Sequence, residues 1–438
     1  MQAIVSRLHE YMNALDQRGY FQGAVLVGHQ GEKLLCRGYG MANEEHGVIN
    51  TPQTKFRIGS LTKGFTAVAI LQLEERGLLS TEDNIGRYLP NFPNGNRMTI
   101  HHLLTHTSGI PDFAGLPEYW TRIMRLPSSL DETIRLFRDL PLEFTPGDQF
   151  RYSNSSYILL TRIIEEVSGE SYTDFIRNNI LVPLDMNDTG VDDGRTIIKG
   201  MASGYSVWKE KIRAEHIDMS IPQGAYGMYA TVEDLYRWDQ ALLTEQLASS
   251  STLRKMFTPY RENYGYGWVI QPLTIAGKPR KCISHYGDVN GFCGNMLRLA
   301  DNGWTVIVLS NLSLTPVTQI GKNLLRIALG EPARVPDTVQ TLDWLGDDIA
   351  SIAGTYRLDH LDENLKITAD GKKLYLTVAK MHGAPYCYPI HPISKTNGRI
   401  QCVTEYVDEE LRFDLHGDAV RLTYTDMNGR KRSFDRMV

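Results

Sequence analysis

The segment that most constrains the fold runs from residue 56 to residue 75, because it carries no charged side chain between Lys63 and Glu74. Apolar residues occur on every face of the helix expected there, which is typical of a helix buried on all sides. Ser60 and Lys63 are three residues apart at its start. They therefore lie on the same face, one turn apart.

This spacing has a chemical consequence. A lysine alone in an apolar helix is desolvated, which lowers the pKa of its amine and makes a neutral proton acceptor available. The hydroxyl of a serine is a poor nucleophile until such a base takes its proton. The start of a helix also offers backbone N–H groups to an anion. The segment therefore predicts a serine acyl-transfer site at Ser60 and Lys63.

Size and charge exclude several other classes of protein. With 438 residues the chain exceeds the roughly 250–300 residues of a single core, so we expect two domains. The net charge is −5 and no dense basic cluster occurs, which argues against a nucleic-acid partner. No apolar run approaches the roughly 18 residues that a membrane span needs.

The N-terminus and the cysteines predict a cytoplasmic protein. Apolar residues recur at helical spacing in residues 4–15, which indicates an amphipathic surface helix rather than a signal peptide. The five cysteines are scattered and form no C-x-x-C pair, so we expect buried thiols in a reducing compartment.

The order of predicted elements indicates an α+β fold. A β-hairpin is expected over residues 23–38 and is followed by several helices, among them one that opens at 152–154 and ends at Gly169. Four strands are then expected at 264–271, 282–286, 294–299 and 305–310, before a returning helix at 316–329. This order predicts one sheet assembled from both ends of the segment.

The C-terminal residues show a different sequence pattern. Residues 331–336 read as linker sequence, and beyond them short strands alternate with the turn pairs Asp370-Gly371, Gly417-Asp418 and Asn428-Gly429. We therefore expect a first domain at 1–335, a linker at 336–351 and a small antiparallel β-barrel at 352–438.

Three short motifs occur together in a fixed order. The S-x-x-K pattern is weak alone, since it occurs at Ser60–Lys63 and again at Ser206–Lys209. The second copy has no buried helix behind it and is expected to be a solvated turn or strand. Only the first precedes both a Y-x-N motif, Tyr152-Ser153-Asn154, and an H-x-G motif, His285-Tyr286-Gly287.

With these motifs the chain resembles the serine β-lactamase and penicillin-binding-protein superfamily. It is most similar to the branch that holds class C β-lactamases, D-aminopeptidases, alkaline D-peptidases and related esterases. The flanking segments 102–109, 145–147 and 228–235 also fit, so residues 20 to about 330 are covered. The resemblance implies a β-lactamase-like antiparallel sheet with an all-helical subdomain. The C-terminal residues are similar, more loosely, to lipocalin-like barrels.

The resemblance also implies roles for individual residues. Ser60 is the expected nucleophile, and Tyr152 is the expected general base, its pKa lowered by Lys63. Asn154 is expected to hydrogen-bond the amide of the substrate. The expected oxyanion hole consists of the backbone N–H groups of Ser60 and of Asp288, which follows Gly287.

Two positions depart from the family pattern. His285 stands where lactamases have a lysine for the substrate carboxylate, and an imidazole binds a carboxylate less well than an ammonium. This departure disfavours specific penicillin hydrolysis and favours amides or esters. Tyr226 stands where relatives usually have glycine, and it is expected to narrow the pocket.

We therefore expect a serine hydrolase, without metal or cofactor, that acts through Ser60 on D-amino-acid amides, D-peptides or small esters. The expected partner is a small-molecule or peptide substrate, and a homo-oligomer stays open. One alternative is transfer of the same acyl group to an amine, including peptide cyclisation. Another is a catalytically idle sensor or scaffold. A metallohydrolase using His102 and His106, at i and i+4, is the third.

Overall fold

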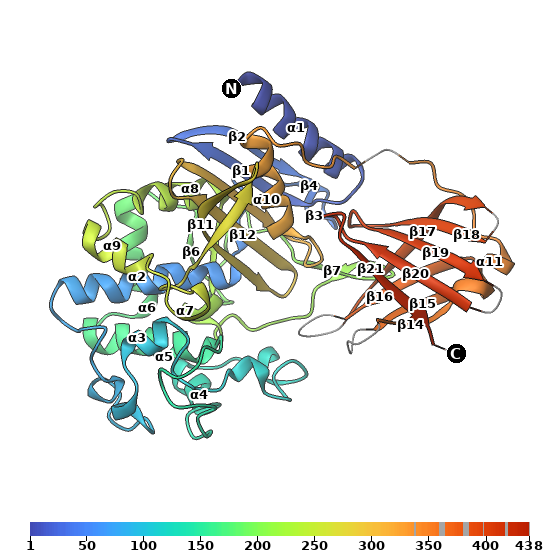
Figure 1. The fold of residues 1–438 in the computed structure, drawn as a ribbon. Helices are drawn as coiled ribbons and strands as arrows, with labels where there is room; N and C mark the ends of the chain where they lie inside the picture. The colour runs from blue at the N-terminus through green and yellow to red at the C-terminus, as the bar shows by residue number, and fades with distance from the viewer. Residues whose placement is uncertain (337–338, 359–363, 380–384, 397, 417–418, 438) are drawn as a thin grey trace.

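The computed structural model describes the chain except for residues 337–338, 359–363, 380–384, 397, 417–418 and 438. Two parts are evident in Figure 1: a larger N-terminal part that combines sheet and helices, and a C-terminal barrel of strands. In the described part of the chain, no helix is long and apolar enough to cross a membrane.

A six-stranded antiparallel sheet forms the centre of the N-terminal part. Its strands lie in the order β10-β11-β12-β13-β1-β2. They comprise β1 (Gly23–His29), β2 (Glu32–Tyr39), β10 (Val269–Ile275), β11 (Lys278–Val289), β12 (Phe292–Leu299) and β13 (Trp304–Ser310). Since β1 pairs with β13, residues from both ends of this part share one sheet, as predicted.

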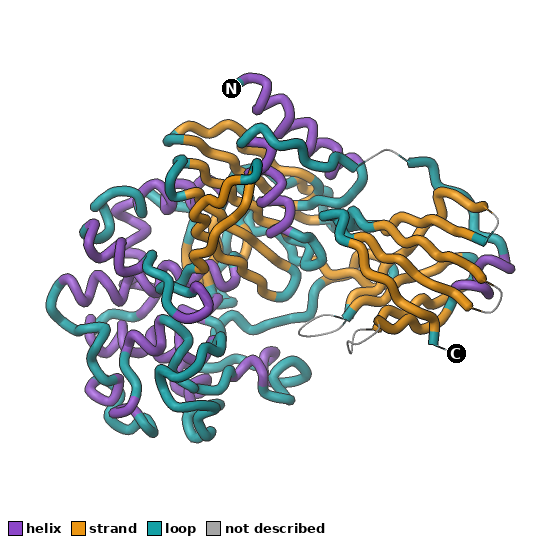
Figure 2. The backbone as a smooth tube through the Cα atoms, viewed as in Figure 1, coloured by secondary structure: helices purple, strands orange, loops and turns teal. Residues whose placement is uncertain are grey.

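The sheet is covered on both faces because its strands are apolar on both faces. Val25 and Val27 belong to one hydrophobic cluster, while the alternating Ala24 and Leu26 belong to another. Helices α1 (Gln2–Gln17) and α10 (Val317–Ala328) supply the first cluster. The second cluster is larger and holds the helices between β2 and β10. Figure 2 shows these helices gathered at one side of the strands.

The helical region contains the predicted buried helix. Helix α2 (Thr62–Glu75) is buried at every residue from Thr62 to Leu73, and the short 3-10 turn η1 (Gly59–Leu61) precedes it. Helix α5 (Asn154–Ser168) ends at Gly169 in the left-handed conformation, as expected. The remaining helices are α3 (Ile100–Leu104), α4 (Leu130–Arg135), α6 (Tyr172–Ile176), α7 (Gln223–Tyr226), α8 (Val232–Ala241) and α9 (Ser250–Met256). The same part of the chain also contains two small sheets. One consists of β3 (Met41–Asn43) and β4 (Val48–Ile49), and the other of β5 (Phe56–Arg57), β9 (Met228–Ala230) and β6 (Gly190–Val191).

One predicted strand begins later than expected. The sequence predicted a strand from residue 264, but β10 begins at Val269. Gly267, at a φ of +76°, turns the chain so that a Cβ there would lie 2.8 Å from the carbonyl oxygen of Lys63. Residues 264–268 therefore pack against the start of α2 instead of joining the sheet.

The C-terminal part is a closed eight-stranded antiparallel barrel. Its strands are β14 (Gly354–Leu358), β15 (Asn364–Asp370), β16 (Lys373–Val378), β17 (Tyr386–Thr396), β18 (Arg399–Thr404), β19 (Glu410–His416), β20 (Ala419–Thr425) and β21 (Lys431–Arg436), preceded by helix α11 (Gly346–Ile352). The pairing of β16 with β17 closes it. Gly371 and Gly429 adopt positive φ at two of the predicted turns, and Gly417-Asp418 lies outside the described residues. Side chains such as Tyr356, Phe413 and Phe434 fill the interior.

An arm from the N-terminal part extends the barrel sheet. Strand β7 (Tyr205–Trp208) pairs in parallel with β17 at Cys387, and β8 (Glu210–Arg213) forms the edge. The second S-x-x-K copy lies here, on a strand as expected. Its solvated character is as predicted only in part: Ser206 is buried, whereas the side chain of Lys209 is 42% exposed and pairs with Asp370 of the barrel at 2.5 Å.

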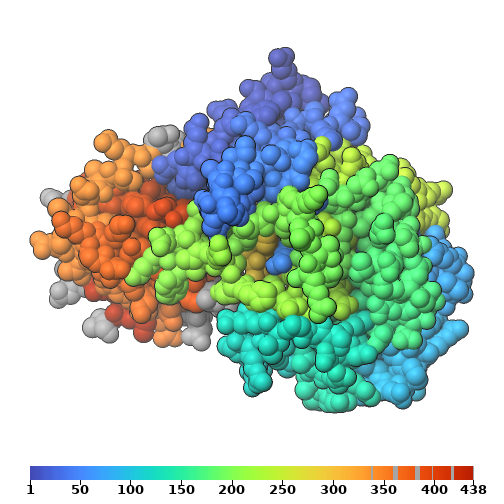
Figure 3. Space-filling view, turned by 180° about the vertical axis from the view of Figure 1, so that it is seen from behind, coloured from blue at the N-terminus to red at the C-terminus, as the bar shows by residue number. Residues whose placement is uncertain are grey.

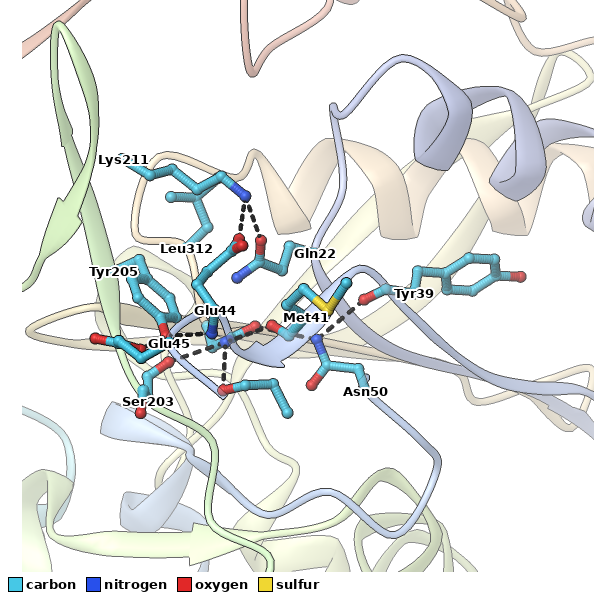
Figure 4. Close-up of polar contacts among 12 residues, drawn as sticks. Gln22, Tyr39, Met41, Glu44, Glu45, Asn50, Ser203, Tyr205, Lys211 and Leu312 are labelled. Atoms are coloured by element: carbon cyan, nitrogen blue, oxygen red, sulfur yellow. Dashed lines mark hydrogen bonds and ion pairs between the residues drawn. The ribbon is translucent and has the colours of Figure 1, made fainter. Parts of the chain in front are cut away.

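The arm is also tied to the N-terminal part by polar contacts. Figure 4 shows the hydroxyl of Tyr205 directed at Glu45, to whose carboxylate it donates a hydrogen bond of 2.5 Å. The amine of Lys211 donates to the side-chain oxygen of Gln22 at 2.9 Å and pairs with Glu44. These contacts place the barrel beside the sheet.

A buried ion pair ties α8 to the sheet. Arg298 on β12 lies 3.5 Å from the carboxylate of Asp239, which also accepts a 2.5 Å hydrogen bond from the hydroxyl of Thr305. Both charged side chains are at most 4% exposed. Burial raises the pKa of Asp239, and the charge of Arg298 opposes that rise.

We predict that Arg298→Met lowers the free energy of unfolding by about 3–5 kcal/mol, because it leaves a buried carboxylate without its partner. Urea unfolding followed by tryptophan fluorescence measures the change. The double variant Arg298→Met with Asp239→Asn removes both charges and is expected to be more stable than the single variant. Equal stability of the Arg298→Met variant and the unmodified chain would contradict the importance of the pair.

Candidate active site

Ser60 lies on the tight turn η1, which packs backbone to backbone against strand β11. A Cβ at Gly59 would lie 2.4 Å from the amide nitrogen of Asp288. A Cβ at Gly287 would lie 2.2 Å from the carbonyl oxygen of Ile58 and 2.7 Å from the amide nitrogen of Ser60. Only glycine permits such an approach. The turn and the strand therefore bring together the backbone amides of Ser60 and Asp288, which the family resemblance assigns to an oxyanion hole.

The amine of Lys63 is the most constrained group in the site. It lies 3.0 Å from the Ser60 hydroxyl, and it donates at 2.8 Å to Oδ1 of Asn154 and at 2.8 Å to the carbonyl oxygen of Ala225. Lys63 is completely buried. Burial lowers the pKa of its amine to about 7, although the charges of Asp112 and Asp288 oppose this shift. The Lys63 amine is therefore removed from water and lies beside the Ser60 hydroxyl.

The expected lowering of the pKa of Tyr152 is not found in the structure. Tyr152 lies just before α5, and Lys63 Nζ is 4.8 Å from the centre of its ring. From the family resemblance we expected Lys63 to lower the pKa of the Tyr152 phenol. Instead, burial raises the pKa of the Tyr152 phenol well above 10, and a hydrogen bond to Ser60 opposes this only in part. The phenol is therefore protonated at neutral pH, because the amine faces the ring and loss of water dominates.

Asp112 also belongs to the site, although it was not among the site residues expected from the sequence. Its carboxylate accepts a hydrogen bond of 3.0 Å from the backbone N–H of Asn154 and one of 3.2 Å from the side-chain Nδ2 of the same residue. Burial raises its pKa. Asn154, expected to bind the substrate amide, is therefore held between Lys63 and Asp112, and it also lines the pocket. The only sequence signal for Asp112 was its place just after the flanking segment 102–109.

His285 is held as a neutral imidazole. Its Nδ1 lies 2.6 Å from the carbonyl oxygen of Tyr286, which can only accept, so Nδ1 carries the proton. Its Nε2 lies 3.0 Å from the hydroxyl of Tyr264, which therefore donates to it. Burial, with the nearby charge of Lys63, lowers the pKa of His285 to about 3. The position where lactamases keep a lysine is therefore occupied here by an uncharged side chain.

Tyr226 ends the short helix α7, directly after Ala225, whose carbonyl accepts from Lys63. Its hydroxyl forms a buried hydrogen bond with the hydroxyl of Tyr119. Its ring stacks on Phe113 at 6.4 Å between ring centres. The side chain is thereby fixed at the wall of the pocket that contains Ser60.

A cavity of about 860 Å³ opens onto Ser60. Its walls are largely apolar and include aromatic residues such as Trp120 and Phe292, and the barrel contributes Ala379 and Tyr386. Tyr386 also donates a 2.9 Å hydrogen bond to the carbonyl oxygen of Ser313, which fixes this contact between the two parts. The charged side chains among its described lining residues are the carboxylates Asp112, Glu262 and Asp288. Figure 3 shows a hollow near the middle of the face that points away from the viewer in Figure 1.

The two histidines proposed as an alternative metal pair do not share a site. Helix α3 ends at Leu104, and His106 adopts a φ of +56°, so the helical i, i+4 geometry is lost. Nδ1 of His102 accepts from the amide of Thr99, whereas Nδ1 of His106 accepts from the amide of Ser153. Among the residues that the structure describes, no group of three or more metal-ligating side chains is present.

Comparison with known proteins shows the family to which the chain belongs. The chain belongs to the Beta-lactamase family, whose model matches residues 6–330. It is similar to penicillin-binding protein 4* of Bacillus subtilis (strain 168), with 31% identity over 442 residues that cover 94% of each chain. The chain therefore has the β-lactamase-like fold of this family.

Two solved structures extend the comparison. The octameric penicillin-binding protein homologue from Pyrococcus abyssi covers 98% of this chain and 99% of its own, with a TM-score of 0.67 and 28% identity. The similarity thus includes the C-terminal barrel. The D-amino acid amidase from Ochrobactrum anthropi SV3 covers 75% of this chain and 98% of its own, with a TM-score of 0.64 and 24% identity, and shares the fold.

We predict that Gly287→Ala slows covalent labelling at Ser60 by about 100-fold, because the new methyl group displaces the turn from β11. The rate of covalent labelling by a fluorophosphonate, read by intact mass, measures the effect. Gly346→Ala is the matched control, since a Cβ at Gly346 would meet no atom within 4 Å. Unchanged labelling of the Gly287→Ala variant would show that the close backbone contact does not matter for the site.

Proposed function

We propose that the protein is a serine hydrolase that forms an acyl-enzyme on Ser60 and acts on D-amino-acid amides, D-peptides or small esters. The observation that carries this proposal is the 3.0 Å contact between the Ser60 hydroxyl and the buried amine of Lys63. A serine beside an amine whose pKa lies near 7 has a base available at neutral pH.

The first half of the reaction follows from these groups. Ser60 Oγ attacks the carbonyl carbon while its proton passes to the neutral amine of Lys63. The backbone N–H groups of Ser60 and Asp288 stabilise the negative charge that develops on the carbonyl oxygen. Tyr152, which is protonated, then donates its proton to the leaving nitrogen or oxygen and regains one from Lys63.

The second half uses the same groups with water. The water attacks the acyl carbon and its proton passes through Tyr152 and Lys63 to Ser60 Oγ, which leaves. In this scheme Tyr152 transfers protons without a lowered pKa, which agrees with its burial. Asn154 fixes the Lys63 amine and faces the substrate side of the pocket.

The charge of the pocket supports an amine-bearing substrate. Its lining carboxylates Asp112, Glu262 and Asp288 favour a cation, and the neutral His285 offers no charge to a substrate carboxylate. Aromatic residues such as Trp120 and Phe292 favour an apolar side chain. The D preference is supported by the shared fold with the D-amino acid amidase and stays part of the proposal.

We expect fluorophosphonate labelling and ester turnover to disappear in Ser60→Ala and to persist in Ser206→Ala, the matched change in the second S-x-x-K copy. In a panel of D- and L-amino-acid amides, the D forms should be preferred. N-acetylation of the substrate should lower kcat/KM by about tenfold, because it removes the ammonium that the carboxylates attract.

The outcomes separate the alternatives. Labelling that persists in Ser60→Ala would refute the acyl-enzyme, and equal D and L turnover would remove the proposed substrate class. Product masses that shift when a free amine is added would favour acyl transfer or cyclisation, for which the cavity of about 860 Å³ has room. Absence of labelling and of turnover in the unmodified protein would favour a sensor or scaffold.

A further inference from the structure

His106 is a buried residue that the proposed reaction does not use. It follows α3, has no exposed surface and adopts a φ of +56°. Residues other than glycine rarely enter this left-handed region. Such conformations persist where the surrounding structure holds them, and they gather at active sites. The buried, left-handed conformation of His106 therefore indicates that neighbouring groups hold this residue in place.

His106 is hydrogen-bonded to both residues that flank Tyr152 in the chain. The carbonyl oxygen of His106 accepts from the amide of Arg151 at 2.9 Å. Its ring Nδ1 accepts from the amide of Ser153 at 3.2 Å. Because one residue holds both neighbours, the backbone that carries the Tyr152 side chain is fixed relative to His106.

The ring of His106 also contacts the ring of Tyr152. Their centres are 4.3 Å apart, and the planes are tilted by 36°. Tyr264 packs against the same imidazole at 4.7 Å. His106 therefore restrains the phenol through its ring as well as through the backbone.

The protonation of the imidazole is unusual for a packing residue. Burial lowers the pKa of His106 well below 6.5, so the ring is neutral, and since Nδ1 accepts, the proton lies on Nε2. This Nε2 is buried and has no hydrogen-bond partner among the described residues. A buried polar atom without a partner is unfavourable, and an apolar ring would avoid it. Histidine at position 106 nevertheless supplies an acceptor, Nδ1, for the amide of Ser153, at the expense of an unpaired Nε2–H.

We infer that His106 is a positioning residue for Tyr152, which it holds at Ser60 by clamping the amides of Arg151 and Ser153 and by packing against the phenol ring. This inference rests on the proposed function, because it assumes that Tyr152 transfers protons in the reaction. His106 is not among the described residues that line the cavity at Ser60. It acts through the orientation of the phenol.

Two substitutions separate the acceptor from the ring. His106→Phe keeps an aromatic ring and loses the acceptor, so the amide of Ser153 is left without its partner. His106→Asn loses the ring, but asparagine tolerates positive φ and its Oδ1 can accept from Ser153. Both are compared with Tyr152→Phe and with the double variant His106→Phe, Tyr152→Phe. Ester turnover is divided by the concentration of sites titrated with a fluorophosphonate, so that misfolded protein does not count.

We expect His106→Phe to lower kcat by about 100-fold with KM nearly unchanged, because a small displacement of a proton-transfer group is that costly. His106→Asn should recover most of this loss. In the Tyr152→Phe background, His106→Phe should have no further effect on kcat, since a residue that acts through the phenol has nothing left to position. A purely structural role would lower kcat equally in both backgrounds.

Several results would overturn the inference. One is an unchanged kcat per titrated site in His106→Phe while Tyr152→Phe is inactive, which would leave the proposed function intact. Another is an equal loss in both backgrounds. Full activity of Tyr152→Phe would overturn the proposed role of Tyr152 and the inference with it. If His106→Phe does not fold, His106→Gly, which tolerates the backbone and lacks the acceptor, replaces it with the same expected loss of kcat.

Discussion

The structure depends on one constraint: the amine of Lys63 is removed from water and held by three oxygen atoms. Ser60, Asn154 and the carbonyl of Ala225 surround it, and each comes from a different part of the helical region. A shift of its pKa from 10.5 to about 7 corresponds to a cost of about 5 kcal/mol for the charged form in the folded state. This cost is present below pH 7 and disappears as the pH rises towards 10.5, because only the unfolded chain still binds the proton there.

The sheet and the barrel complete the site around this amine. Strand β11 approaches the Ser60 turn so closely that residues 59 and 287 must be glycine, which joins the sheet to the helical region at the point where chemistry is expected. The barrel contributes Tyr386 to the wall of the same cavity. The cavity is therefore bounded by both parts of the chain, although the proposed reacting groups all lie in the first.

The sequence predicted what local patterns encode and missed what depends on packing. The buried helix with Ser60 and Lys63 was predictable, because its lack of charge is local. Tyr152 and His285 followed from their motifs, but the raised pKa of Tyr152 did not, since it reflects burial by distant segments. Asp112 carries no spacing signal relative to Asn154. Tyr264, the partner of His285, was assigned to a strand that begins only at Val269.

The most direct test is the pKa of Lys63 itself. Lysine labelled with 13C at the ε carbon reports the protonation of each amine by NMR, and the Lys63→Arg variant identifies the signal. The account predicts a titration midpoint near 7 for Lys63, well separated from the exposed lysines. A midpoint near 10.5, with the other lysines, would mean that the amine is solvated and would contradict the central claim.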